Sequence, residues 1–316
     1  MIRPFGTMPG GEAVHLYTLS RGPITAAVTD LGATLVSLKV PDAAGTVADV
    51  VLGYGDAAGY LNGRGYLGAT VGRNANRIAG ACFVLDGTTW SLPANQGPNS
   101  LHSGPDGWHK RLWQVADRSD SHITFQLESP HCDQGFPGAM TVRVTYSLEA
   151  PATLSIRYWA LSDRDTIFNP TNHSYFNLAG REARQATKQI LTLPARFFTP
   201  CGKGNIPTGE CKPVEGTPMD FRSPKPLDRD TNLLFRGYDH NFEVFCDPCA
   251  VLRDPGSGRT MAVSTDRPGL QLYTTSFGIC LETQFWPDAI HHPDWPQPII
   301  KAGIPTESLT SFAFSW

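Results

Sequence analysis

Apolar and polar residues alternate with a period of two along much of the chain. Successive side chains of an extended strand point to opposite faces, so this alternation is typical of a strand with one buried face. We therefore predict strands at Ile24–Thr29, His122–Glu128, Met140–Leu148, Ala152–Leu161, Thr260–Thr265, Leu270–Thr275 and Leu309–Trp316.

Turn signals separate these runs, for example Asp86–Gly87, Gly135–Gly138 and Arg253–Gly258. Glycine supplies the positive φ and proline the fixed φ that tight turns require. No segment of a dozen residues shows a convincing 3.6-residue period, and the best candidate, residues 181–190, is short and polar. We therefore predict an all-β fold: a large antiparallel β-sandwich with few short helices, forming a single domain over residues 1–316.

Charge and composition exclude several classes of protein. The chain has 26 Lys and Arg against 29 Asp and Glu, a net charge of −3, so nothing favours binding to nucleic acid or to an anionic membrane. No apolar run is long enough for a membrane span or a signal peptide. The seven cysteines are an odd number, which is typical of reduced thiols. We expect a cytoplasmic protein.

Two motifs are weak. Gly53–Gly59 resembles a dinucleotide-binding loop, but its spacing differs and the residues after it do not look like a helix, so we predict a plain turn. Cys246 and Cys249 have the spacing of zinc ligands but lack a second pair at a suitable distance. We expect neither a metal nor another cofactor.

Stronger signals come from polar groups that lie among aromatic residues. A lone histidine in a strand is usually a hydrogen-bonded core residue, but a glutamate such as Glu282 inside an apolar run is rarely buried without a partner. Sugar hydroxyls both donate and accept hydrogen bonds, and sugar C–H faces stack on rings, so amides, imidazoles and carboxylates beside rings favour a sugar site. The candidates are Asn76, Arg77, His102, His173, Ser174, Tyr175, Asp239, Gln271 and Glu282.

Six segments that contain or adjoin these residues resemble, in order, the aldose 1-epimerase family, the galactose mutarotases. They are "GRNANRIAGA", "LHSG", "GFPG", "NPTNHSYFNL", "YDHNF" and "LETQFWPDA", and together they span most of the chain. The resemblance implies a galactose mutarotase-like supersandwich with the site on a concave sheet face. It also implies reversible interconversion of α and β anomers of a free aldose without a cofactor.

The resemblance also implies residue roles. Glu282 is expected to be the general base and His173 the general acid, while the substrate-binding groups are expected to be Asn76, Arg77, His102, Ser174, Tyr175, Asp239 and Gln271. Two departures stand out: Ser103 replaces a glycine of the family, and a long loop between Gln271 and Glu282 is missing, which predicts a shortened rim. Which aldose is the substrate, and whether the protein is a monomer or a homodimer, stay open.

The expected chemistry requires Glu282 to be ionised while His173 is protonated, an order that follows from their ordinary pKa values of about 4.3 and 6.5. Three alternatives remain. A glycoside hydrolase would use Asp239 and Glu282 as its carboxylate pair. An epimerase of sugar phosphates would need a basic cluster beyond Arg77. A non-catalytic sugar-binding or sensor protein would have no need of an acid and base pair.

Overall fold

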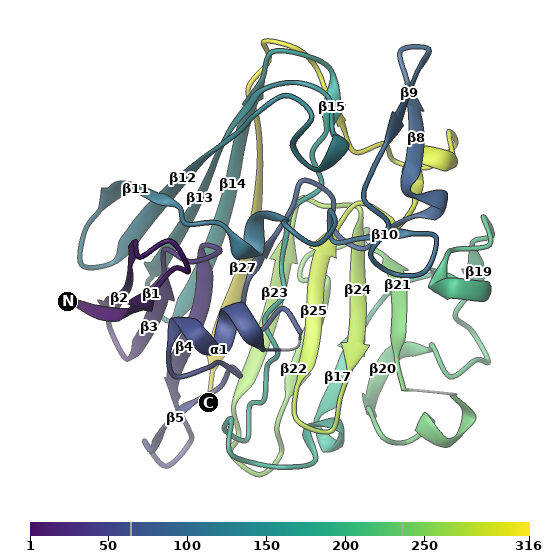
Figure 1. Cartoon of the computed structure of the whole chain (residues 1–316). Helices are drawn as coiled ribbons and strands as arrows, with labels where there is room; N and C mark the ends of the chain where they lie inside the picture. The colour runs from purple at the N-terminus through teal and green to yellow at the C-terminus, as the bar shows by residue number, and fades with distance from the viewer. Residues whose placement is uncertain (64, 235–236) are drawn as a thin grey trace.

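The computed structural model describes residues 1–63, 65–234 and 237–316, and strands dominate it (Figure 1). Neighbouring strands of every sheet pair antiparallel in the described chain. The largest sheet has nine strands, in the order β11 (Gln114–Arg118), β12 (His122–Ser129), β13 (Met140–Glu149), β14 (Thr153–Ser162), β27 (Thr306–Ser315), β23 (Thr260–Thr265), β22 (Ala250–Arg253), β17 (Ile190–Leu193) and β20 (Phe221–Pro226).

Two five-stranded sheets accompany it (Figure 1). The first runs β1 (Ile2–Thr7), β2 (Ala13–Arg21), β3 (Ile24–Thr29), β4 (Thr34–Pro41), β5 (Val47–Asp49). The second runs β19 (Lys212–Pro213), β18 (Phe197–Thr199), β21 (Asp239–Glu243), β24 (Gly269–Thr274), β25 (Ile279–Gln284). Short pairs complete the fold: β10 (Ser100–Leu101) with β7 (Arg77–Ile78), β16 (Thr171–Asn172) with β6 (Thr70–Val71), β8 (Cys82–Leu85) with β9 (Thr88–Ser91), and β15 (Thr166–Ile167) with β26 (Ile299–Ile300).

Helices are few and short. Residues 181–190, the best helix candidate in the sequence, hold no α-helix and only the 3-10 turn η4 (Ala186–Lys188). The other 3-10 turns are η1 (Ala79–Ala81), η2 (Trp108–Lys110), η3 (Asp133–Gly135), η5 (Lys203–Asn205), η6 (Thr231–Leu233) and η7 (Ala289–His291). No helix in the described ranges has the length and apolar character needed to cross a membrane.

The α-helix α1 (Ala57–Asn62) corrects one expectation, because it begins inside the glycine segment where we predicted a plain turn. The Asp56 carboxylate accepts a hydrogen bond from the Gly59 amide at 2.8 Å and caps this six-residue helix. A carboxylate therefore already occupies the helix N-terminus, the place where a dinucleotide motif would bind phosphate.

The alternating pattern buries one face of each long strand, and the all-β prediction is confirmed. In β13, Met140, Val142 and Val144 are buried while Arg143 is exposed. One continuous apolar cluster joins residues of all three large sheets. Each fully buried large aliphatic side chain contributes roughly 1.5–3 kcal/mol to the stability of the fold.

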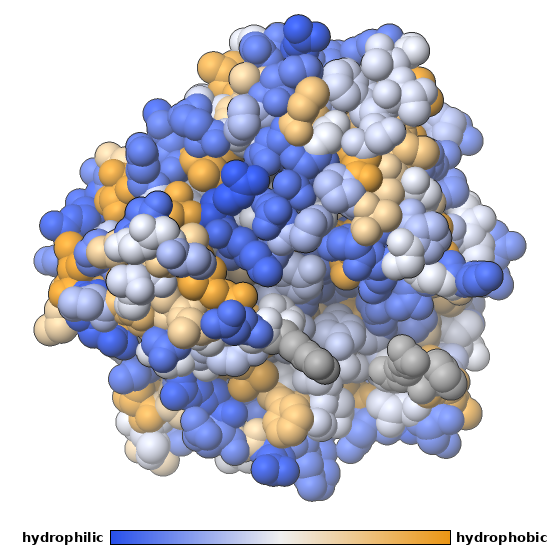
Figure 2. Space-filling view, in the orientation of Figure 1, coloured by the Kyte–Doolittle hydropathy of each residue, from blue (hydrophilic) through white to orange (hydrophobic). Residues whose placement is uncertain are grey.

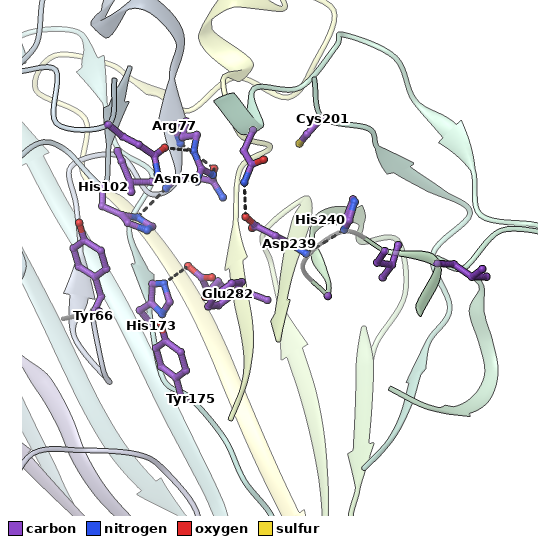
Figure 3. A pocket seen from close by; sticks show the side chains of 18 residues that line it. Tyr66, Asn76, Arg77, His102, His173, Tyr175, Cys201, Asp239, His240 and Glu282 are labelled. Atoms are coloured by element: carbon purple, nitrogen blue, oxygen red, sulfur yellow. Dashed lines mark hydrogen bonds and ion pairs between the residues drawn. The ribbon is translucent and has the colours of Figure 1, made fainter. Parts of the chain in front are cut away.

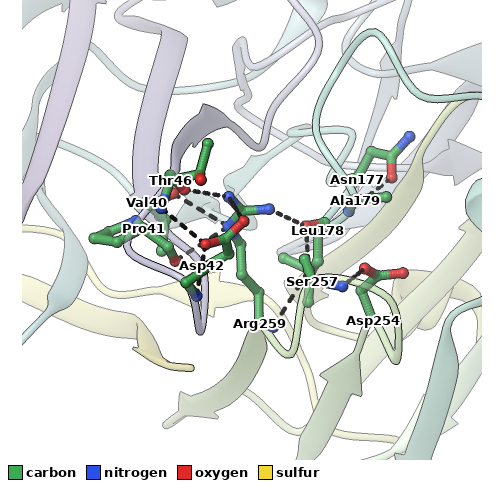
Figure 4. Close-up of polar contacts among 11 residues, drawn as sticks. Val40, Pro41, Asp42, Thr46, Asn177, Leu178, Ala179, Asp254, Ser257 and Arg259 are labelled. Atoms are coloured by element: carbon green, nitrogen blue, oxygen red, sulfur yellow. Dashed lines mark hydrogen bonds and ion pairs between the residues drawn. The ribbon is translucent and has the colours of Figure 1, made fainter.

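A buried arginine, Arg259, joins the turn between β4 and β5 to the chain at Leu178 (Figure 4). Arg259, after β22, donates to the carbonyl oxygens of Val40 at 3.1 Å, Leu178 at 2.9 Å and Thr46 at 2.8 Å. Its charge lies 3.7 Å from the Asp42 carboxylate. These contacts hold the end of the first sheet, the large sheet and the chain after His173 in a fixed relation.

The tight hairpin of β24 and β25 positions the candidate base. Only residues 275–278 join the two strands, which confirms the short connection expected from the sequence. Their antiparallel register places Gln271 directly opposite Glu282, and the register of β21 with β24 places Asp239 opposite Tyr273.

Candidate active site

A cavity of about 640 Å³ opens between the second five-stranded sheet and the loops around β7 and β10. The face shown in Figure 2 is hollowed near its centre. The volume of the cavity lies within the roughly 300–1,000 Å³ typical of small-molecule sites. The lining residues are mostly polar or aromatic: Gly65, Tyr66, Asn76, Arg77, Gln96, Leu101, His102, His173, Tyr175, Cys201, Asn205, Leu233, Leu234, Gly237, Asp239, His240, Tyr273 and Glu282.

His173 and Glu282, far apart in the chain, meet in this cavity (Figure 3). Nε2 of His173 lies 3.6 Å from Oε2 of Glu282, and the two residues are only 5% and 2% exposed. Oε2 makes no hydrogen bond within the described chain, although it is buried. A buried carboxylate oxygen without a donor is costly unless a ligand supplies the donor.

Burial reverses the expected order of the two pKa values. It raises the pKa of Glu282 from 4.5 to about 8, helped by the negative charge of Asp239 and opposed by Arg77. It lowers the pKa of His173 from 6.5 to about 4. Loss of hydration disfavours the charged form of each group, so the shared proton of the pair sits on Glu282 at neutral pH and His173 is neutral.

Three groups hold the His173 ring in place. It stacks against Tyr175 at a centroid distance of 5.1 Å and an interplanar angle of 19°, and against Tyr66 at 5.7 Å and 23°. Nδ1 lies 3.6 Å from Sγ of Cys280, the residue two positions before Glu282 on β25. With Nδ1 directed to the thiol, Nε2 is the nitrogen that faces the carboxylate.

His102 is a neutral hydrogen-bond donor. The backbone N–H of Asn76 donates to its Nδ1 at 3.1 Å, so in the neutral ring the proton resides on Nε2. Burial holds the pKa of His102 well below its usual range, and His173 and Arg77 lower it further.

The same hydrogen bond bears on metal binding. His102, His173 and Glu282 are the one group of three potential ligands found within the described ranges, with ligand atoms within 4.8 Å of one another. A metal needs an imidazole lone pair, but the lone pair on Nδ1 of His102 already accepts a hydrogen bond and Nε2 carries the proton. The group therefore does not fit a metal, and Cys246 and Cys249 form no such group.

The loop that carries His102 has an unusual backbone. His102, Ser103 and Gly104 have φ values of 52°, 66° and 89°, a left-handed stretch that favours glycine. Ser103 compensates with its hydroxyl, which accepts from the Asn74 amide at 2.7 Å and donates to the Asn74 carbonyl at 3.1 Å. The serine at this departure from the family pattern thus joins the two loops that form this wall.

Arg77 and Asp239 lie on different walls of the cavity. Arg77 donates from Nε to Oε1 of Gln96 at 2.5 Å, and no carboxylate in the described residues lies within 4.0 Å of its guanidinium. The Asp239 carboxylate accepts from Asn205 at 2.9 Å and from Gln271 at 2.7 Å. The cavity thus offers donors from Arg77 and an acceptor at Asp239.

Seven of the nine predicted residues line the cavity, and two do not. The exceptions are Gln271, which lies behind Asp239 and holds its carboxylate, and Ser174, whose buried hydroxyl donates to Asn172 at 2.6 Å. Sequence reasoning missed six lining residues that carry polar or ring groups: Tyr66, Gln96, Cys201, Asn205, His240 and Tyr273. His240 stands beside Asp239 in "YDHNF", and Tyr273 lies in the predicted strand Leu270–Thr275. The other four lie in segments without a distinctive pattern.

Comparison with known proteins agrees with this geometry. The family described as aldose 1-epimerase matches residues 15–313. The pig galactose mutarotase is 38% identical in an alignment 334 residues long, gaps included, that covers 98% of this chain and 97% of the relative. The chain belongs to the aldose 1-epimerase family. The aldose 1-epimerase of Escherichia coli K12 is 35% identical, with 97% and 96% of the two chains covered.

Solved structures extend the agreement to the whole fold. A GalM/aldose epimerase homologue from C. elegans superposes with a TM-score of 0.90 at 27% identity, covering 96% of this chain and 99% of the other. The galactose 1-epimerase of Lactobacillus acidophilus gives a TM-score of 0.88 at 25% identity, with 100% and 98% covered. Members of this family are isomerases, and the fold and sequence of this chain agree with that class.

Proposed function

We propose that the protein interconverts the α and β anomers of a free aldose, with Glu282 as general base and His173 as general acid. The observation that carries this proposal is the approach of Nε2 of His173 to Oε2 of Glu282, at 3.6 Å, inside a polar cavity large enough for a monosaccharide. A glycosidic bond, a metal or a nucleotide is not required for this reaction.

The two groups complete the reaction by moving two protons. The Glu282 carboxylate takes the proton of the C1 hydroxyl while His173 delivers a proton to the ring oxygen, and the C1–O5 bond breaks. The C1 oxygen becomes the carbonyl of an open-chain aldehyde, and rotation about C1–C2 presents its other face. The protons then return by the reverse transfers as the ring closes. Each positioned proton transfer contributes roughly 10²–10⁴-fold to the rate.

The pKa order of this pair fits one half of this cycle. After ring opening, Glu282 is a neutral carboxylic acid and His173 a neutral imidazole, which is the arrangement that burial favours. The arrangement that opens the ring, with Glu282 ionised and His173 protonated, contains the same single proton on His173 instead of Glu282. The pair therefore keeps one proton in both states, and no proton needs to enter from solvent during a turnover.

The walls of the cavity support the choice of a free aldose. Arg77 is the one Lys or Arg in the described lining, which is too little positive charge to favour a phosphorylated sugar. Asn76, Arg77 and the Nε2–H of His102 can donate to sugar oxygens, and Asp239 can accept from a hydroxyl. His102 would also stabilise negative charge that develops on a sugar oxygen.

We also propose a cytosolic location, without a cofactor, as a monomer or a homodimer. All seven cysteines are free thiols, which supports a reducing compartment.

Polarimetry on freshly dissolved α-anomers of glucose, galactose, xylose and arabinose tests the proposal. We expect the protein to accelerate mutarotation of at least one of them and Glu282→Gln to abolish that activity while sugar binding persists. The amide keeps the shape of the side chain but loses its basicity. Stabilisation by sugar without mutarotation would instead assign a sensor role, and release of sugar from an aryl glycoside would assign a hydrolase.

A further inference from the structure

A second cavity, of about 210 Å³, shares no lining residue with the sugar cavity. Its volume is below the roughly 300–1,000 Å³ of sites for drug-sized ligands, so any occupant is small. Most of its walls are apolar, and none of the described lining residues is acidic: Phe168, Arg267, Phe285, Pro298, Ile299, Ile300, Lys301, Ile304 and Thr306.

Arg267 in this cavity is buried without a counterion. It is 6% exposed, and no carboxylate of the described residues lies within 4.0 Å of its guanidinium. Nη2 donates to the Ser308 hydroxyl at 2.7 Å, but Nε is buried without a partner and Nη1 makes no hydrogen bond within the described chain.

Two other buried arginines show how the fold satisfies such a group. Arg73 and Arg259 each donate from all three guanidinium nitrogens, mostly to backbone carbonyls. Arg267 donates from one. Its incomplete hydrogen bonding is therefore a local feature and not the way this fold usually buries arginine.

Aromatic rings only partly replace the missing anion. The Arg267 guanidinium carbon lies 4.9 Å from the centroid of Phe285 and 5.7 Å from that of Phe168. Such contacts stabilise a cation less than burial destabilises it. Burial lowers the pKa of Arg267 to about 10, so the side chain still carries its charge at neutral pH. The second cation, Lys301, is already paired with Asp165 at 2.5 Å.

We propose that this cavity binds a small carboxylate with an apolar body, its carboxylate on Arg267 and its body against Phe285 and Ile304. Nη1 makes no hydrogen bond within the described chain and Nη2 has a second N–H besides the one donated to Ser308, so this edge of the guanidinium can donate two parallel hydrogen bonds to a carboxylate. A single unpaired cation balances a single negative charge, and the apolar walls exclude a strongly hydrated ion such as phosphate. The ligand is thus a monocarboxylate of aryl or short alkyl type.

Calorimetric titration with sodium benzoate tests the site, with benzamide as the neutral isostere. We expect benzoate to bind at least about tenfold more tightly than benzamide, since a hydrogen bond to a charged group is worth that much. Arg267→Met should weaken benzoate binding by a similar factor, whereas Arg77→Gln in the sugar cavity should leave it unchanged. Equal binding of the two probes, no binding of benzoate, or loss of binding in Arg77→Gln alone would overturn the proposal.

A second pair of variants guards against misfolding of Arg267→Met. Ile304 at this cavity is 57% exposed and tolerates a charge, so Ile304→Asp should repel benzoate and weaken its binding by about tenfold. Val47, 54% exposed and absent from the lining, provides the matched control Val47→Asp, which should bind benzoate as the unaltered protein does. Identical binding by both aspartate variants would place the benzoate elsewhere and refute the assignment.

Discussion

Replacing Glu282 by glutamine should make stability less sensitive to pH, because a buried carboxyl couples folding to proton uptake. The pKa of Glu282 is about 8 in the folded protein, against 4.5 for a hydrated glutamate such as that of the unfolded chain. Between these values the folded chain retains a proton that the unfolded chain has lost. The stability that Glu282 contributes is therefore fully present below pH 4.5 and is lost as pH rises to about 8.

The magnitude follows from the two pKa values. Each pH unit within this window changes the free energy of unfolding by about 1.4 kcal/mol. From pH 5 to pH 8, the unaltered protein should lose roughly 3–4 kcal/mol relative to Glu282→Gln. Below pH 8, Glu282 in the unaltered protein and the glutamine in the variant are both neutral. His173 therefore has a similar environment in the two proteins, and its own titration cancels from the difference in stability.

Urea denaturation followed by tryptophan fluorescence, at half-unit steps from pH 5 to pH 8.5, measures this difference. Glu182, an exposed glutamate, provides the matched control Glu182→Gln, which makes the same substitution without removing a buried carboxyl. A difference between the unaltered protein and Glu282→Gln that stays constant to within about 1 kcal/mol across the range would refute the reasoning.

Four further predictions follow from the same geometry. The pair of His173 and Glu282 holds one proton between its two pKa values, so kcat/KM should be nearly level from about pH 5 to about pH 7 and fall to half its plateau near pH 4 and near pH 8; a rate that changes about tenfold between pH 5 and pH 7 would contradict this. Asp239→Asn removes a charge that raises the pKa of Glu282, so the basic limb of that profile should move to lower pH, and a move to higher pH would exclude the assigned cause. Tyr175→Leu should lower kcat about tenfold by removing a ring face that stabilises protonated His173, while Tyr175→Phe should restore it in the same polarimetric assay. Arg259→Met leaves several buried carbonyl oxygens without donors and should lower the free energy of unfolding by about 3 kcal/mol, as measured by urea denaturation. An unchanged free energy of unfolding would mean that solvent reaches these carbonyls and would contradict the prediction.

Local pattern predicted the strands well because one face of each long strand is buried. Ile24–Thr29 and Thr260–Thr265 match the predicted bounds, and β13 extends only one residue beyond the predicted end. The helix at Ala57–Asn62 was missed because six residues are too few to display a period. Its cap, Asp56, followed by small residues, was the available signal.

The site could be predicted only in part, because its residues meet through long-range packing. Glu282 was identifiable from its cost in an apolar run and His173 from its polar and aromatic neighbours, and family resemblance supplied their roles as base and acid. Tyr66 lies in an irregular loop and Asn205 ends the short turn η5, and nothing local indicates that their side chains reach the cavity. The order of the two pKa values was predicted wrongly, because reference values carry no information on burial, which the fold alone determines.

The central claim, that Glu282 and His173 move protons as one unit, is tested most directly by the mutarotation rates of Glu282→Gln, His173→Asn and the double variant, measured by polarimetry on the same aldose. Either single change leaves the remaining group without its partner, so we expect each to slow turnover by several orders of magnitude. The double variant should then be no slower than the slower single variant, within about tenfold. Losses that multiply in the double variant, or a His173→Asn protein that retains its rate within about tenfold, would contradict the account.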